Sequence, residues 1–396
     1  VALTPSGLKA LAELGKSDAA GQRALAAQTP PGLQSLQDML QFYEQLLQFL
    51  GAEVECIAAG LSIDGNANVK VVANAVLTSE GKLAGLAGHR ASEAKLLVGY
   101  ANEPFVVAGG FPIPPAYRDA APALARQVLE AWPALYGFED FTAKDWADVE
   151  NSWKQTVAGV QSISAMLYVG EEDDPLLDNI YVVLNVDDSR QYVDSYASAG
   201  KKWNELMSRS TSDVALPATI ADVEVAGQKG LLMTEDVLKA GEDPNVPTSR
   251  IVMKALVGED GVAETFVVPA DQDTVVIGMA GKDDVAKLMK AVASGESGLE
   301  KSVAIQTSAR LLNENANLLA LVSPKGLVAY IDRVYNKFLA PLGPGGFELP
   351  EYPESPPIGM TLAVGDDRVT GEIVWPAETL SGLADYIKKW DERMAR

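Results

Sequence analysis

Hydrophobic residues in the first part of the chain change from a helical spacing to a strand-like one. Leucines recur three residues apart at 8–14, and apolar side chains follow similar intervals at 33–47. This spacing gathers apolar side chains on one helix face, so residues 1–52 are predicted to form a helical N-terminal segment. Apolar runs at 57–63 and 69–77 then flank an Asp-Gly-Asn turn, which is typical of a β-hairpin.

Farther along the chain, strands and hairpins are each followed by a helix. Predicted strands cover residues 105–111, 163–169, 180–186, 251–257, 264–268, 275–279, 318–322 and a hairpin over 358–375. Predicted helices cover residues 120–132, 143–157, 189–207, 326–339 and 378–394, with one more that begins at Asp283. Short turns cannot join parallel strands, so the pattern predicts an α+β fold with a largely antiparallel sheet, or sheets, and covering helices.

Two sequence motifs occur twice in the same order. Residues 163–170 and 358–365 share Ile, Leu, Val and Gly at equal spacing, and an Asp-Asp pair follows each stretch. Lys-Lys-Trp-x-Glu-x-Met comes later in both cases, at 201–207 and 388–394. Two repeated motifs in one order predict two related halves from an internal duplication. We interpret the repeated Trp and Met as core residues that seat a helix on its sheet.

The predicted duplication divides the chain into segments. Residues 1–52 form the helical N-terminal segment, 53–210 the first α+β half and 211–396 the second. Pro and Gly are dense in residues 340–357, so this stretch is linker-like before the last hairpin and helix.

Composition and charge narrow the classes of function. Hydrophobic residues make up 47% of the 396 positions and charged residues 22%, as expected for a folded protein. The net charge of −22 repels phosphate backbones, so we expect no nucleic-acid binding. No apolar run approaches the roughly 18 residues of a transmembrane helix, so we expect no membrane-spanning segment. The chain begins with Val1 and not with Met, which indicates that a signal peptide or a tag has been removed; we expect a signal peptide.

The residue types that serve as nucleophiles and bases are scarce and lack their usual companions. His89, the only histidine, lies in a polar connector and is interpreted as a surface or capping residue. Cys56, the only cysteine, lies in an apolar run and is interpreted as a buried, inert thiol. Gly15-Lys16-Ser17 lacks the first glycine of a P-loop, and Ser198 with Lys201 lacks the other motifs of penicillin-recognising enzymes. We therefore predict no catalytic residue and no cofactor.

Carboxylates gather in turns and at helix starts, where they accept hydrogen bonds from backbone amides. Residues 64–68 begin like a calcium loop but lack its glycine and its final glutamate, so a hairpin turn explains them better. The densest acidic cluster is Glu171, Glu172, Asp173 and Asp174. We interpret this cluster as a solvated surface, and if a divalent cation binds, these four residues are its candidate ligands.

Three sequence segments at structural junctions occur together in the chain. They are Pro-Phe-Val-Val-Ala-Gly-Gly at 104–110, a hairpin over 176–186 that enters Asp-Asp-Ser, and Leu-Val-Ser-Pro-Lys-Gly at 321–326. In this combination the chain resembles uncharacterised secreted proteins of planctomycete-type bacteria, from about residue 50 onward. The resemblance implies an extracytoplasmic protein, periplasmic or secreted, and brings no activity with it.

Three functions stay open at this point. The first is a non-enzymatic protein that acts in binding, or in structure and assembly. Its partner would be another protein or a second copy of itself. The absence of catalytic motifs favours this function. The second is a carrier of a lipid or other hydrophobic small molecule, because a curved sheet with helices can enclose an apolar cavity. The third is a hydrolase whose carboxylates are distant in sequence. An apolar hollow would favour the carrier, and paired carboxylates in a pocket would favour the enzyme.

Overall fold

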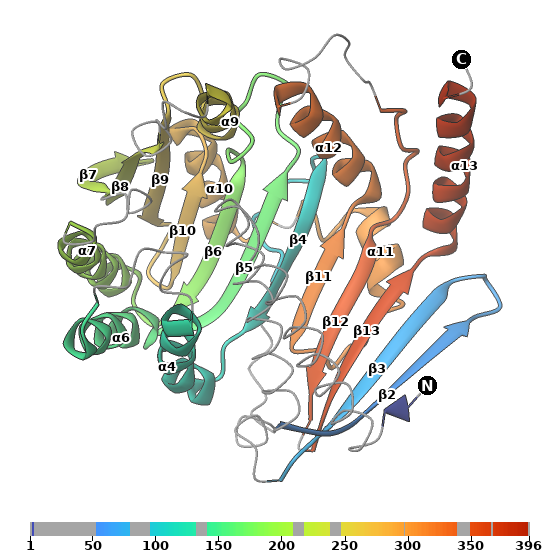
Figure 1. Cartoon of the computed structure of the whole chain (residues 1–396), viewed down its shortest axis with the longest axis horizontal. Coiled ribbons are helices and arrows are strands. Elements are labelled where there is room, and N and C mark those ends of the chain that lie inside the picture. Colours follow the sequence, from blue (N-terminus) through green and yellow to red (C-terminus); the bar gives the residue numbers. More distant parts are fainter. Residues whose placement is uncertain are drawn as a thin grey trace, which may run out of the picture.

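The computed structural model describes residues 2–3, 53–79, 96–131, 141–208, 218–237, 247–296, 298–338, 349–365 and 367–394. These residues build one large antiparallel sheet with helices on both of its sides (Figure 1). The predicted α+β class with a largely antiparallel sheet and covering helices is therefore confirmed.

The sheet has thirteen strands in the order β1-β2-β3-β13-β12-β11-β4-β5-β6-β10-β9-β8-β7. Their bounds are β1 Ala2–Leu3, β2 Val54–Ile63, β3 Val69–Leu77, β4 Phe105–Pro112, β5 Val160–Tyr168, β6 Ile180–Val186, β7 Thr219–Val225, β8 Gln228–Asp236, β9 Val262–Pro269, β10 Thr274–Met279, β11 Leu318–Val322, β12 Ile358–Val364 and β13 Arg368–Trp375.

Two of the described helices, α6 and α7, begin at side-chain caps that the sequence carries. The bounds of the described helices are α4 Pro115–Ala131, α6 Ala143–Val157, α7 Ser189–Met207, α9 Pro247–Val257, α10 Lys282–Ser294, α11 Val303–Ala309, α12 Pro324–Phe338 and α13 Ala377–Met394. Before α6, Thr142 and Asp145 form a reciprocal capping box. Before α7, the Asp188 carboxylate accepts the amides of Arg190 and Gln191 at 3.0 Å. The elements β6, β11, α6 and α7 have the predicted bounds, and for the two helices the local caps explain the agreement.

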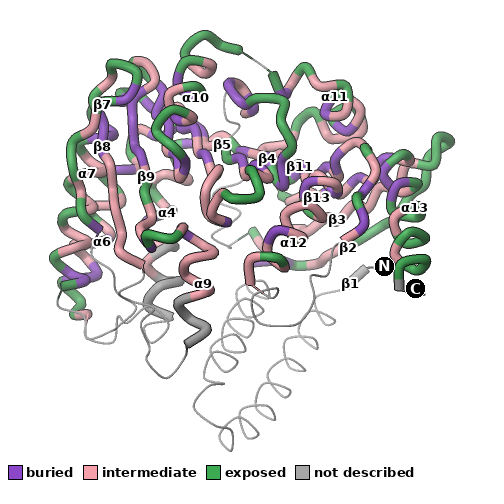
Figure 2. Tube along the Cα trace, turned by 90° about the horizontal axis from the view of Figure 1, so that it is seen from above, coloured by how far each residue is buried: buried purple, intermediate pink, exposed green. Residues whose placement is uncertain are grey.

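The middle strands of the sheet are buried on both faces. On one face, Met166, Tyr181 and Val276 pack against Leu288 and Met289 of α10. The other face carries a second cluster, in which Leu184, Val267 and Val275 pack against Tyr192 and Val193 of α7. Seen from above, α10 and α11 lie on one side of the sheet, and α4, α9 and α12 lie on the other (Figure 2). Among the described residues, no helix is both long enough and apolar enough to cross a membrane.

Strands from the two predicted halves alternate along the sheet. The hairpin β2-β3 borders β13, while β4 lies between β11 and β5. The domain boundaries stay a prediction.

The helical N-terminal segment is not confirmed. Ala2–Leu3 forms β1 beside β2, and the rest of that segment lies outside the described residues.

Two predictions of secondary structure need correction. Residues 251–257, predicted as a strand, belong to α9, which begins at Pro247. A short apolar run does not distinguish a strand from a helix, and proline favours the first helical turn. The hairpin β7-β8 is absent from the sequence-based prediction. Its turn has positive φ at both Ala226 and Gly227, as a two-residue hairpin turn of this kind requires.

The repeated motifs both lie in a hairpin followed by a helix, β5-β6-α7 and β12-β13-α13. The repeated aromatic residue does not seat α7 on the sheet, which corrects that interpretation. Trp203 and Met207 pack against Trp146 of α6, in a layer of helices outside the sheet. In α13, Trp390 lies 6.3 Å from the ring of Tyr386, a neighbour on its own helix.

Candidate functional site

One face of the sheet is apolar across six neighbouring strands. Paired residues of adjacent strands point to the same side, and side chains alternate between sides along each strand. The pairings Val107 with Val322, Met360 with Ile373 and Val71 with Leu61 therefore define one face. We call this surface the apolar face. It consists of Ile57, Ala59, Leu61, Ile63, Val69, Val71, Ala73, Ala75, Val369, Gly371, Ile373, Trp375, Ile358, Met360, Leu362, Val364, Leu318, Ala320, Val322, Val107, Gly109 and Phe111.

The polar side chains of the same strands lie on the opposite face. Lys70 forms an ion pair of 2.9 Å with Glu372, and the Thr370 hydroxyl donates to Asn74 Oδ1 at 2.8 Å. Both interactions join β3 to β13. Period-two alternation therefore keeps these polar side chains off the apolar face, although the opposite face also carries apolar residues such as Leu321 and Val374.

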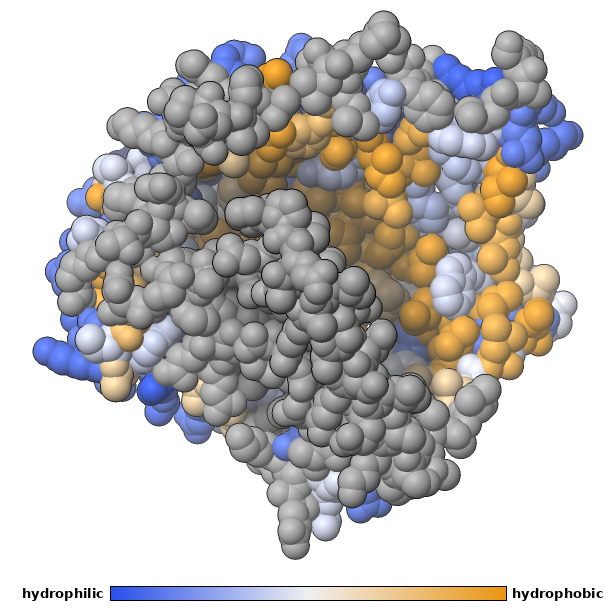
Figure 3. Space-filling view, in the orientation of Figure 1, coloured by the Kyte–Doolittle hydropathy of each residue, from blue (hydrophilic) through white to orange (hydrophobic). Residues whose placement is uncertain are grey.

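The apolar face is partly open to solvent. Val107 is 38% exposed, Phe111 40% and Leu362 36%, and Leu61 and Ile63 near the hairpin tip are more exposed still. On the side of the sheet that carries the apolar face, α4, α6 and α7 lie over the other half of the sheet, and no described helix covers β12, β13 and β3 (Figure 1). The helix α11 contacts β12 from the opposite side (Figure 2). Figure 3 shows hydrophobic side chains gathered in a hollow over this region. An exposed, contiguous apolar surface of this kind marks an interaction site.

A second hollow, which we call the acidic cleft, lies at one end of β5 and β6 beside α10. Its volume is about 980 Å³, within the usual range of small-molecule sites. The lining residues are Gly99, Ala101, Glu103, Pro104, Tyr168, Val169, Gly170, Glu171, Asp174, Asn179, Tyr181, Asp284, Lys287, Leu288, Ala291 and Glu296. They come from three stretches far apart in sequence, which the sheet and α10 bring together.

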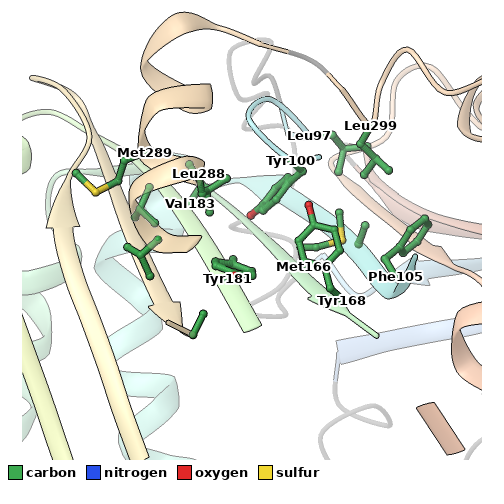
Figure 4. Packing of buried hydrophobic residues seen from close by; sticks show 14 of the residues in the cluster. Leu97, Tyr100, Phe105, Met166, Tyr168, Tyr181, Val183, Leu288, Met289 and Leu299 are labelled. Atoms are coloured by element: carbon green, nitrogen blue, oxygen red, sulfur yellow. The ribbon is translucent and has the colours of Figure 1, made fainter. Parts of the chain in front are cut away.

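Aromatic residues form the inner wall of the acidic cleft. The rings of Tyr168 and Tyr181 meet edge to face with centroids 5.7 Å apart. Figure 4 shows these rings and Tyr100 between Leu288 of α10 and the segment around Leu97. Burial raises the pKa of Tyr168 and of Tyr181, and the negative charge of Glu103 raises both further.

The predicted cation ligands lie at the rim of this cleft but do not all face it. Asp174 Oδ2 accepts the backbone amide of Glu171 at 2.7 Å and the Asn179 side chain at 3.0 Å. Glu171 and Asp174 line the cleft, whereas Glu172 and Asp173 are exposed outside it. Among the described residues, no three acidic, histidine or cysteine side chains converge as metal ligands would.

Other residues considered from the sequence lie away from both hollows. Asp64 accepts the amides of Asn66 and Asn68 at 2.8 and 2.9 Å, so the calcium-like stretch is a hairpin turn. The hydrogen bonds from Asn68 hold the pKa of Asp64 below its usual value. Cys56 is half-buried in β2, and Ser198 is exposed on α7. His89 and the Gly15-Lys16-Ser17 motif lie outside the described residues.

Comparisons of this chain with protein families, with curated proteins and with solved structures found no match. Its function therefore has to be argued from its own residues. The chain belongs by architecture to the α+β class, with one large antiparallel sheet. Its particular features are an apolar face on one half of that sheet and an acidic cleft on the other side.

Proposed function

We propose that this protein is a non-enzymatic binding protein that holds a lipid, or another elongated hydrophobic ligand, on its apolar face. The observation that carries the proposal is the unbroken set of apolar positions from β2 to β4. Removing such a surface from water contributes about 25 cal/mol per Å² of apolar area. An acyl chain laid across several strands would gain this free energy without any directional contact.

The chemistry of the apolar face favours an acyl chain over a protein partner. Protein interfaces carry about one hydrogen bond per 100–200 Å², supplied by polar side chains among the apolar ones. On these strands Lys70, Asn74 and Glu372 all lie on the opposite face, so their polar groups cannot serve such an interface. The hollowed form of the surface in Figure 3 also suits a slender ligand better than a flat partner.

Displacement of a fluorescent long-chain fatty acid from the full-length protein tests the proposal. Leu362→Lys places a charge on the apolar face, and Val107→Thr introduces a hydroxyl with almost no change of shape. We expect Leu362→Lys to weaken binding about tenfold or more, since about 1.4 kcal/mol of lost contact has that effect. Val107→Thr should weaken binding less, because a hydroxyl is less costly to bury than an ammonium group.

Leu383→Lys is the matched control. Leu383 lies on α13 away from the sheet and is 45% exposed, compared with 36% for Leu362. Equal loss of binding in both lysine variants would show that binding of the probe depends on the charge of the protein and not on the apolar face. Absence of binding by the unaltered protein would contradict the proposal outright.

The assembly function remains the second candidate, and native mass spectrometry distinguishes it. A lipid carrier should retain acyl-chain mass as a monomer. A dimer without lipid, dissociated by Leu362→Lys, would instead favour assembly through the apolar face. A hydrolase would act in the acidic cleft, where the carboxylates gather.

The extracytoplasmic location stays a prediction that rests on the sequence alone, namely on the resemblance and on the expected removal of a signal peptide. We also retain internal duplication as a proposal. Two observations support it: the shared motifs at 163–170 and 358–365, and the hairpin-then-helix order of both copies.

A further inference from the structure

The acidic cleft lies on the other side of the sheet from the apolar face and has a separate chemistry. Five carboxylate side chains line it, against one ammonium group, that of Lys287. The carboxylates belong to Glu103, Glu171, Asp174, Asp284 and Glu296. Lys287 Nζ lies 2.6 Å from Asp284 Oδ1, so the cleft already accommodates one ammonium group beside a carboxylate. Its remaining charge is strongly negative.

A buried tyrosine supplies a separate indication of a ligand. Tyr181 is only 5% exposed, yet it lines the cleft. Its hydroxyl has no hydrogen-bond partner among the described residues, whereas the Tyr168 hydroxyl donates to the Ala101 carbonyl at 3.2 Å. Among the described residues, the buried side-chain polar atoms that lack a partner do not include this oxygen, so it opens onto the cleft and can accept a hydrogen bond there. The free oxygen of Tyr181 therefore offers a position for a ligand group.

The electrostatics at this hydroxyl specify the sign of the ligand. Burial raises the pKa of Tyr181, and the carboxylates of Asp284, Glu103, Asp178 and Asp174 raise it further. These groups come from α10, from the segment before β4 and from the β5-β6 turn. A negative potential from three sides opposes an anion and attracts a cation.

A buried cation, Arg333, is bound to the backbone of two residues that line the cleft. Arg333 of α12 donates from Nη2 to the Asp174 carbonyl at 2.7 Å and from Nη1 to the Val169 carbonyl. It therefore holds the backbone of the β5-β6 turn in place. Within the part of the chain that the structure describes, the carboxylate side chains around the cleft do not converge on one point as ligands of a metal ion would.

We propose that the acidic cleft binds a small aliphatic di- or polyamine. One ammonium group donates to the Tyr181 hydroxyl oxygen, and the others pair with the carboxylates spaced around the wall. Separated carboxylates match separated ammonium groups, whereas a divalent metal ion needs its oxygen ligands within about 2.6 Å of a single centre. The volume of about 980 Å³ admits such a ligand with its hydration water.

Isothermal titration of spermidine into the full-length protein at low ionic strength tests the inference, since salt screens exposed charges. Tyr181→Phe keeps the ring and removes the hydroxyl, and we expect about fivefold weaker binding, the equivalent of one hydrogen bond. Asp284→Asn should also weaken binding about fivefold. Lys287→Gln should strengthen it, because the resident ammonium group no longer competes.

Asp283→Asn is the matched control. Asp283 precedes Asp284 on α10, is exposed and does not line the cleft. An equal loss of affinity in both Asn variants would overturn the inference, because it would mean attraction to the net charge alone. Calcium ions alone, titrated under the same conditions, should not bind in the cleft. If calcium does bind, and if Asp284→Asn weakens that calcium binding, the choice of an organic amine is overturned. Absence of spermidine binding would overturn it as well, whatever the result for the fatty-acid probe.

Discussion

Single residues decide how closely neighbouring elements approach. Gly326, in the first turn of α12, lies against the start of β4, and a Cβ atom there would overlap the carbonyl oxygen of Phe105. Ser323 prepares this approach: its hydroxyl oxygen accepts the Gly326 amide at 3.1 Å. The Ser-Pro-Lys-Gly stretch predicts a helix start, but the need for glycine comes from a strand more than 200 residues earlier.

Gly326→Ala should lower the free energy of unfolding by about 1–3 kcal/mol, the usual cost of overpacking. Alanine normally stabilises a helix by about 1 kcal/mol relative to glycine. A loss of stability in Gly326→Ala would therefore indicate the close contact and not helix propensity. Chemical denaturation measures the change. Gly60→Ala is the control, because nothing lies within 4 Å of its added Cβ. A stabilised Gly326→Ala variant would contradict the close contact.

Asp178 makes stability depend on pH. Burial, together with the negative charges of Asp174, Glu264 and Asp260, raises the pKa of Asp178 to about 6, although Arg333 opposes the shift. In the unfolded chain an aspartate titrates near 3.9. Between about pH 4 and pH 6 the folded state therefore binds more protons, so the contribution of this group to stability falls as pH rises through that window.

Asp178→Asn should raise the melting temperature near pH 7.5 and change it little near pH 4, since the lost group is charged in the folded state only above about 6. Thermal unfolding at both pH values measures the difference. Asp173→Asn removes the same charge from an exposed position of the same turn and so reports the effect of net charge alone. A uniform shift at both pH values would refute the assignment.

At the scale of the elements, local signals determine where helices begin. The Thr142 hydroxyl accepts the Asp145 amide at 3.3 Å, and the Asp145 carboxylate accepts the Thr142 amide at 2.9 Å. All of these groups lie within four residues, so the start of α6 could be predicted. The apolar run at 251–257 fits a strand or a helix equally well, and the proline that begins α9, Pro247, is the local signal that favours the helix.

Thr142→Ala should destabilise the protein by about 1 kcal/mol, the usual value for a lost N-cap. Urea unfolding checks this value. Ser152→Ala, inside the same helix, removes only a hydroxyl that bonds to the Asp148 carbonyl at 3.0 Å. That variant should change stability by less than about 0.5 kcal/mol. Equal losses in the two variants would argue against a specific role for the cap.

At the scale of the whole molecule, the single sheet connects segments from both predicted halves. β4 is hydrogen-bonded to β5 on one side and to β11 on the other. The ion pair between Lys70 and Glu372 and the hydrogen bond between Asn74 and Thr370 tie β3 to β13 in the same way. Neither predicted half could unfold without exposing sheet edges of the other.

We therefore expect one calorimetric transition for the described fold, with the calorimetric enthalpy close to the van't Hoff value. Lys70→Met should lower its midpoint, because it leaves the largely buried Glu372 carboxylate without its counter-charge. Two resolved transitions, of which Lys70→Met affects only one, would show that the halves are independent.

The sequence by itself determined the α+β class and most element positions, because periodicity, caps and turns act between near neighbours. It also contained the alternation that makes the apolar face, yet only the pairing of β2, β3, β13, β12, β11 and β4 joined these runs into one surface. The acidic cleft was decided by tertiary structure alone. Glu103, Tyr181 and Asp284 are brought together by strand order and by the position of α10, which depend on contacts between residues far apart in the chain.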